Sequence, residues 1–191
     1  MTLLEAAQGL FGAWRLLHFD RTGLQHFRAT RAGFVNSFWA AAIVLPGDAI
    51  ATLLFASANP ETFAGSGPGR VISVYLLIYI IQWVLFPLVM AGLSEAGLRR
   101  EQFVLFVVAH NWSSVVRMVI ILPAVAIFAA AGIGSAGWGA AIFFAALLAT
   151  WAYTWYVARV ALETSGRVAL LVVGLEIGIA IMLSWVTNGM T

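Results

Sequence analysis

The chain alternates between five long apolar runs and short polar segments. The runs cover residues 34–57, 71–93, 102–131, 138–158 and 168–186. Each run can form a helix of about 20 residues, the length that crosses the hydrocarbon core of a bilayer. Strands of an outer-membrane barrel would instead alternate over about ten residues, and the chain lacks that pattern. The pattern therefore predicts an all-helical polytopic membrane protein, with a bundle of five transmembrane helices in residues 33–191.

Residues 1–32 are predicted to form a separate cytoplasmic segment, which begins with an amphipathic helix over residues 2–19. Apolar side chains recur there at helical spacing: Leu3, Ala7, Leu10, Trp14 and Leu17. Thr2 and Glu5 have the spacing of a capping box. The helix is too polar to span a bilayer, so two placements are open. It lies in the interface with Trp14 as an anchor, or it packs against the bundle.

Residues 20–31 form a basic connector between this helix and the first apolar run. Arg28 and Arg31 lie near its end. Basic side chains beside a membrane attract anionic lipid headgroups. Both residues are therefore candidate interfacial anchors, with an ordinary solvated segment as the alternative.

Composition supports a membrane protein and excludes several other classes. The chain is 62% hydrophobic and 9% charged, whereas soluble domains carry roughly a quarter charged residues. All ten basic residues are arginine and the net charge is +2, so nucleic-acid binding has no basic cluster to rest on. The absence of cysteine excludes disulfides and thiolate metal sites. The N-terminus lacks a basic n-region and a cleavage site, so no cleaved signal peptide is expected.

The arginines predict the orientation, because cytoplasmic loops are enriched in basic residues. With a cytoplasmic N-terminus, Arg70 lies outside and Arg117 lies in the membrane. The other eight lie inside: Arg15, Arg21, Arg28, Arg31, Arg99, Arg100, Arg159 and Arg167. The prediction is a multi-pass protein of the bacterial inner membrane, with the N-terminus cytoplasmic and the C-terminus periplasmic.

The third run carries a cluster of polar side chains: His110, Asn111, Ser113, Ser114 and Arg117. An arginine at a helix centre costs about 2.5 to 3.5 kcal/mol on insertion scales, so Arg117 should have a partner. Asp48 in the first run lies at nearly the same depth, roughly 21 Å from the cytoplasmic end at 1.5 Å per residue. We therefore predict an ion pair between Asp48 and Arg117.

A second polar layer is predicted nearer the cytoplasmic side. His110 and Glu176 both lie about eight residues into their runs, or roughly 12 Å deep. Residues 110, 113, 114 and 117 share one helical face, which could present both layers to the bundle interior. Two interpretations stay open. The polar groups hold the helices together, or they form a path for protons or a site for a polar solute.

Further features concern helix packing. Prolines inside the first three runs predict kinks: Pro46, Pro87 and Pro123. Gly174 and Gly178 form a Gly-x-x-x-Gly pair that could receive another helix closely. In the second run, Gln82 is expected to form a hydrogen bond with Asn111.

The chain offers no set of residues for catalysis. One intramembrane histidine without cysteine or a second histidine leaves no metal-ligand set. Ser113 and Ser114 lie beside His110, but no third group orients that imidazole. The chain has no phosphate-binding glycine loop. We therefore expect no enzyme activity, no metal and no cofactor.

Five closely spaced spans after a cytoplasmic segment resemble the Yip-domain family of small polytopic membrane proteins. The resemblance covers residues 34–186 and is architectural. The eukaryotic members carry an Asp-Leu-Tyr-Gly-Pro stretch after the first span. This chain has Pro46-Gly47-Asp48 within the first run and no equivalent of that stretch. The resemblance implies a non-enzymatic protein that binds membrane partners.

Two functions follow from these patterns. The first is an integral membrane scaffold, assembly factor or accessory subunit that acts through helix-helix and lipid contacts. Its partners would be the bilayer and another membrane protein or a second copy of the chain. The alternative is a small proton-coupled transporter or channel that uses the Asp48/Arg117 and His110/Glu176 layers.

Overall fold

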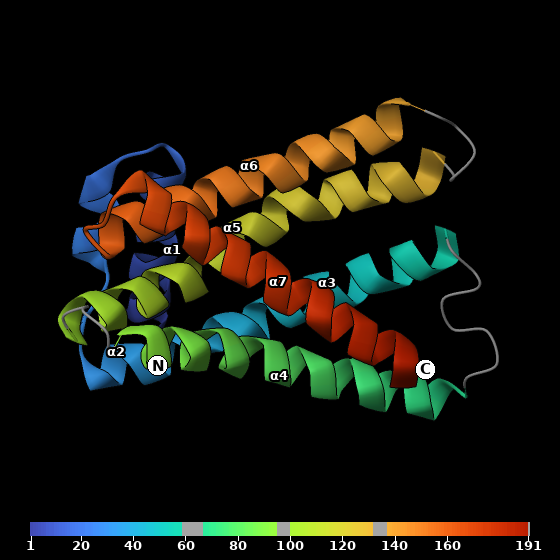
Figure 1. Ribbon diagram of the computed structural model, residues 1–191, viewed down its shortest axis with the longest axis horizontal. Helices are drawn as coiled ribbons and strands as arrows, with labels where there is room; N and C mark the ends of the chain where they lie inside the picture. Colours follow the sequence, from blue (N-terminus) through green and yellow to red (C-terminus); the bar gives the residue numbers. More distant parts are fainter. Residues whose placement is uncertain (59–66, 95–99, 132–136, 191) are drawn as a thin grey trace.

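The computed structural model describes residues 1–58, 67–94, 100–131 and 137–190, and every regular element in these ranges is helical (Figure 1). In chain order the elements are α1 (Leu3–Leu17), the 3-10 helix η1 (Arg21–His26), α2 (Arg31–Ser37), α3 (Trp39–Ala58), α4 (Pro68–Ser94), α5 (Arg100–Ala131), α6 (Trp138–Ala161) and α7 (Gly166–Met190). The short helix η1 lies in the predicted connector and was not predicted.

Five stretches of helix are long and apolar enough to cross a membrane, as the apolar runs predict. They are Arg31–Ala58, Pro68–Leu93, Arg100–Ala131, Trp138–Ala161 and Gly166–Thr187. The first combines α2 and α3, which are separated by Phe38 alone. The three prolines that were expected to kink their helices lie inside α3, α4 and α5.

Helix α5 lies at the centre of the bundle and contacts α1, α2, α3, α4 and α6. Its residues from Phe106 to Ser113 are all buried. Because polar and apolar side chains are buried there together, each polar group needs a partner from a neighbouring helix. The polar groups of the candidate site therefore gather around α5.

Helix α1 begins at the predicted capping box, in which the Thr2 hydroxyl accepts from the Glu5 amide and the Glu5 carboxylate accepts from the Thr2 amide. Glu5 also accepts from Arg28 and from Asn36, each at 3.2 Å. The hydrogen bond from the Thr2 amide and the nearby Arg28 guanidinium lower the pKa of Glu5. At the other end of α1, hydrogen bonds from Thr22 and Arg15 lower the pKa of Asp20.

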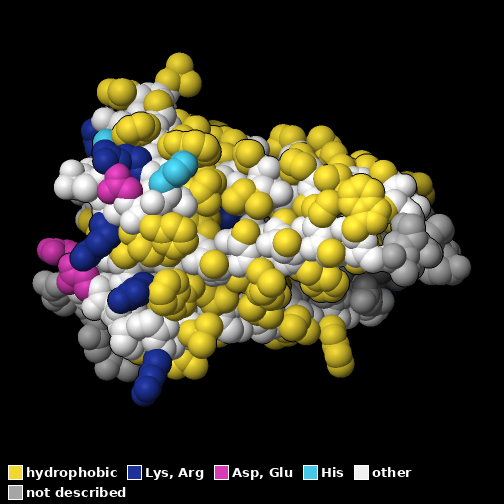
Figure 2. All heavy atoms as spheres, turned by 90° about the horizontal axis from the view of Figure 1, so that it is seen from above, with side chains coloured by type: hydrophobic (Ala, Val, Ile, Leu, Met, Phe, Trp, Pro, Cys, Tyr) yellow, Lys and Arg dark blue, Asp and Glu magenta, His cyan; other side chains and the backbone are white. Residues whose placement is uncertain are grey.

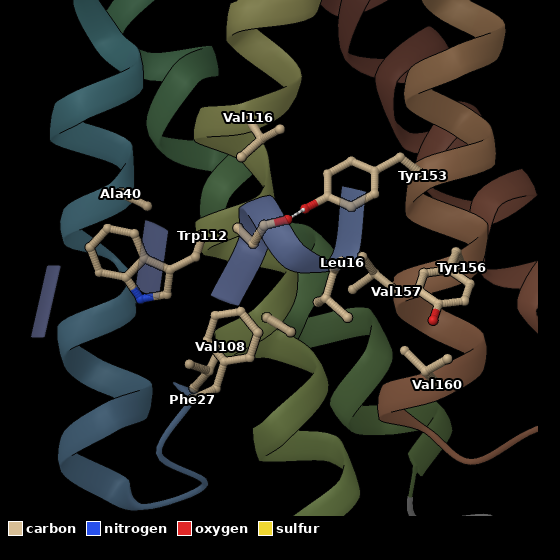
Figure 3. Close-up of a cluster of buried hydrophobic side chains, with 12 residues drawn as sticks. Leu16, Phe27, Ala40, Val108, Trp112, Val116, Tyr153, Tyr156, Val157 and Val160 are labelled. Carbon is tan, nitrogen blue, oxygen red and sulfur yellow. Dashed lines mark hydrogen bonds between the residues drawn. The ribbon is translucent and has the colours of Figure 1, made fainter. Parts of the chain in front are cut away.

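The inner face of α1 packs on the bundle through small residues. A Cβ added at Gly9 would lie 2.5 Å from the Trp112 ring, closer than real Cβ atoms come to other atoms. Ala13 and Leu16 complete this face and are fully buried. Figure 3 shows Leu16 of α1 in one cluster with Trp112 of α5 and with Tyr153 and Val157 of α6. The face that packs on the bundle is therefore not centred on the predicted apolar face of α1. Leu3 and Trp14 of that face are exposed, as are Leu4 and Phe11.

The surface of the bundle is apolar along its length and charged at one end (Figure 2). Of the nine arginines in the described ranges, seven lie at the end that contains α1, which we call the α1 end. Arg70 lies at the opposite end, where its Nε donates to the Met190 carbonyl at 2.7 Å. Arg117 lies between the ends, inside the bundle.

Candidate functional site: a polar cavity inside the helix bundle

Arg117 of α5 pairs with Glu176 of α7, with Nη1 2.5 Å from Oε1. The two side chains are 18% and 22% exposed. The predicted ion pair between Asp48 and Arg117 is therefore wrong. Side chains lean toward the N-terminus of their own helix, and α5 starts at the α1 end (Figure 1). The long Arg117 side chain thus places its guanidinium closer to the α1 end than its own Cα. A count of residues along the helix gives the depth of the Cα and not that of the guanidinium.

The guanidinium of Arg117 is held by three helices. Besides Glu176, Nη1 donates to Thr154 of α6 at 3.1 Å. Nη2 donates to Ser114, one turn back on α5, at 2.7 Å. Charge-assisted bonds of this kind are stronger than bonds between neutral groups. The arginine side chain is therefore fixed in place, with both terminal nitrogens engaged.

His110 joins the same group, so Arg117 belongs to the layer predicted for His110 and Glu176. Its Nε2 lies 3.7 Å from Glu176 Oε1 and 3.4 Å from Arg117 Nη2. Since a guanidinium can only donate, Nε2 acts as the acceptor and the imidazole is neutral in this arrangement. The ring packs against Phe86, with centroids 4.6 Å apart. The contact predicted between His110 and Glu176 is thus present, and Arg117 forms part of it.

Asp48 lies apart from this group and contacts α4. Its Oδ2 accepts a hydrogen bond from the Tyr75 hydroxyl at 2.8 Å. Tyr79, one turn further along α4, donates instead to the Ala41 carbonyl at 2.6 Å. Both tyrosines of α4 therefore bond to α3, and Tyr75 takes the place beside Asp48 that was expected for Arg117.

Asn111 and Ser113 attach α5 to other parts of the fold. Asn111 Nδ2 donates to the buried Ser37 hydroxyl at 2.9 Å. The predicted bond between Asn111 and Gln82 is not formed, although the structure describes both residues. Ser113 lies 2.9 Å from the Tyr153 hydroxyl, which donates to the Ala13 carbonyl of α1 at 2.6 Å. Since a tyrosine hydroxyl has one proton, Ser113 donates to Tyr153.

The polar side chains surround a cavity of about 310 Å³ to which α3, α4, α5, α6 and α7 all contribute. Its polar lining consists of Asp48, Tyr79, Gln82, His110, Asn111, Ser114, Arg117, Thr150 and Glu176. Seven of the eight polar residues predicted from the sequence thus meet in one place. The eighth, Ser113, faces α1 and α6 instead.

A second cavity of about 250 Å³ adjoins the first. Three residues line both cavities: Asp48, Tyr79 and Gln82. Thr52 and Thr187 add polar groups to the second cavity, and Thr187 lies near the C-terminal end of α7. A polar lining therefore continues from the middle of the bundle toward the end opposite α1. We call the first space the central cavity and the second the outer cavity.

Polar residues of α6 were missed in the sequence, although a signal was present. Thr150, Tyr153 and Thr154 have i, i+3 and i+4 spacing and so share one helical face. All three are buried. Thr150 lines the central cavity, and Thr154 accepts from Arg117.

The remaining predicted residues lie on the surface. Gly174 and Gly178 are exposed on α7, and a Cβ added at either would meet no described atom within 4 Å. Trp14 is 54% exposed, Arg28 pairs with Glu5, and Arg31 is exposed at the start of α2. No group of three or more His, Asp or Glu side chains that could hold a metal ion occurs within the described ranges.

No protein-family model, curated protein or solved structure matches this chain. The resemblance to the Yip-domain family thus stays a prediction. The central cavity and the apolar surface around it are the features of the described residues that bear on function.

Proposed function

We propose that the chain is an integral protein of a bacterial inner membrane, with five spans and a cytoplasmic α1 end. Five helices have the length and hydropathy of membrane spans. The large apolar side chains exposed along them would face lipid, and the seven arginines at the α1 end agree with the bias for cytoplasmic basic residues. In this orientation Met190 lies on the periplasmic side, and the outer cavity leads toward that side.

We further propose that the central cavity serves the proton-coupled transport of a small polar solute. The observation that carries this proposal is the convergence of Asp48, His110, Arg117 and Glu176, from α3, α5 and α7, on one cavity. Ionisable side chains within a membrane are costly and typically mark ion or substrate paths. If these groups merely held helices together, each would be satisfied by a partner in a packed interface. Asp48 instead has a single neutral partner and lines both cavities.

The role of Asp48 suggests the test of transport. Asparagine keeps the shape of this side chain and can still accept from Tyr75, but it cannot carry a proton. In liposomes loaded with a pH-sensitive dye, the wild-type protein should dissipate an imposed pH gradient faster than lipid alone. Asp48→Asn should abolish that difference, whereas Glu101→Gln, the same kind of change at an exposed residue, should preserve it. A gradient that decays equally with and without protein would overturn the proposal.

A second candidate function is that of an accessory subunit or scaffold, and the surface of α7 favours it. Gly174 and Gly178 lie in the middle of an outward face formed by Leu170, Leu171, Ile181 and Trp185, all exposed. Small residues allow the backbones of two membrane helices to approach closely. A neighbouring protein or a second copy could occupy this face.

Purification from native membranes in mild detergent tests the second function. A stoichiometric partner that is lost on Gly174→Leu, but kept on Ala145→Leu at an exposed position of α6, would support it. Recovery of the chain alone, with no partner and no second copy, would overturn it.

A further inference from the structure

The hydrogen bonds around the central cavity engage the terminal nitrogens of Arg117 and leave carboxylate oxygens without a partner within the described ranges. Both terminal nitrogens of Arg117 are engaged with Thr154, Glu176, Ser114 and His110. In contrast, Glu176 Oε2 is buried and has no hydrogen-bond partner among the described residues. A buried acceptor without a partner costs about 1 to 3 kcal/mol.

Asp48 provides a second free acceptor. Within the described ranges its one hydrogen bond comes from Tyr75 and goes to Oδ2, so Oδ1 is available to a ligand. Gln82 lies beside it in the lining of both cavities and provides a side-chain carbonyl. Within the described ranges, Asp48 Oδ1 is therefore the charged acceptor available to a ligand at this place, and the Gln82 amide beside it can accept through its carbonyl and donate through its NH2 group.

The charges of the lining lead to the same conclusion. All the lining residues lie within the described ranges, and Arg117 is the one among them with a permanent positive charge. It is paired with Glu176, and His110 is neutral in this arrangement. When Asp48 is ionised, the cavity thus has one unbalanced negative charge. An anion would meet this charge, and both terminal nitrogens of the Arg117 guanidinium are already engaged.

Aromatic rings form part of the wall. Tyr79, Trp83 and Phe86 line the central cavity along one side of α4. The rings of Tyr79 and Trp83 have centroids 6.2 Å apart. The faces of aromatic rings attract cations, and the contribution grows to about 2 kcal/mol where water is displaced. A cation with some apolar surface suits this wall better than a hydrated metal ion.

We infer that the central cavity binds a small monovalent organic cation with N–H donors, of the ammonium or guanidinium class. Its charge lies at Asp48, its N–H groups donate to Asp48 Oδ1 and to the Gln82 carbonyl, and its apolar part faces the rings of α4. The volume of about 310 Å³ is at the lower end for ligand pockets, which restricts the ligand to a small molecule. This inference rests on the proposed transport function, because it names the class of solute for the same cavity.

Three probes of similar size separate charge from hydrogen bonding. Guanidinium is a cation with N–H donors, urea has nearly the same planar shape and donors without the charge, and acetate is an anion. The probes would be titrated by calorimetry into the purified full chain in nanodiscs of neutral lipid. Millimolar guanidinium is far below the molar range in which it denatures proteins. We expect guanidinium to bind at least tenfold more tightly than urea, and acetate not to bind.

Variants then locate the site. Asp48→Asn should weaken guanidinium binding at least tenfold, and Glu101→Gln should leave it unchanged. Gln82→Leu removes a neutral acceptor and should weaken binding by a smaller factor. Equal binding of guanidinium and urea, tighter binding of acetate, no binding of guanidinium to the wild-type chain, or unchanged affinity in folded Asp48→Asn would overturn the inference.

Binding and flux can fail independently. Guanidinium binding without any proton flux in liposomes would support this inference and overturn the transport function. Proton flux that depends on Asp48, without guanidinium binding, would support transport and overturn the inference about the solute.

Discussion

Glu176→Gln tests the central ion pair most directly. Removing one partner of a buried pair costs about 3 to 5 kcal/mol, because the other charge is left without compensation. With the side chains of Arg117 and Glu176 18% and 22% exposed, we expect the lower end, about 3 kcal/mol in the free energy of unfolding. Arg117→Gln should cost a similar amount. The double variant removes both charges and should cost no more than either single change, so the coupling energy should reach about 3 kcal/mol.

The assay is unfolding of the purified chain in mild detergent by titration with a denaturing detergent, followed by tryptophan fluorescence. The matched control is a second double-mutant cycle, between Arg117→Gln and Asp48→Asn. Since Asp48 bonds to Tyr75 and not to Arg117, this cycle should give a clearly smaller coupling energy. A coupling of Arg117 to Asp48 that equals or exceeds its coupling to Glu176 would refute the assigned pair.

Three further predictions concern α1 and its attachment. Gly9→Leu should destabilise the chain by about 1 to 3 kcal/mol, because the side chain would overlap a buried tryptophan ring, whereas Gly174→Leu in open space should not; thermal unfolding compares them. The pKa values of Glu5 and Asp20 are lowered in the folded chain, so their contribution is complete above the unfolded-state values near pH 4 and disappears as the pH falls through the folded values. Amide hydrogen exchange should therefore show α1 loosening on acidification, and equal protection of α1 at pH 7 and pH 3 would contradict this. Tyr153→Phe removes the side-chain donor to the Ala13 carbonyl and leaves the buried Ser113 hydroxyl without its partner, so it should cost about 1 to 3 kcal/mol in thermal unfolding; an unchanged unfolding midpoint would contradict it.

Much of the candidate site could be predicted from the sequence, because buried polar residues are conspicuous in apolar runs. Gln82, His110 and Glu176 were identified on that basis, and each lines the central cavity. The α6 contribution was missed, because threonine and tyrosine are common in apolar helices and do not stand out there as charged residues do. The outer cavity had no signal in the sequence, since it depends on how α3, α4 and α7 pack.

The sequence by itself determined the five helical stretches of membrane length and α1. The number and approximate limits of these stretches and the capping box of α1 depend on hydropathy, on length and on contacts between residues three or four positions apart. These properties are local, so they can be read along the chain. The same holds for the gathering of arginines near the helix ends on one side of the bundle.

Only the tertiary structure decided which groups meet. Asp48 and Glu176 are both carboxylates within apolar runs, and a count of residues favoured Asp48 as the partner of Arg117. The actual choice depends on the lean of a long side chain toward its helix N-terminus and on which helix lies opposite. Arg117 and Glu176 are 59 positions apart in the chain. The packing of the whole bundle decides whether two residues so far apart come into contact.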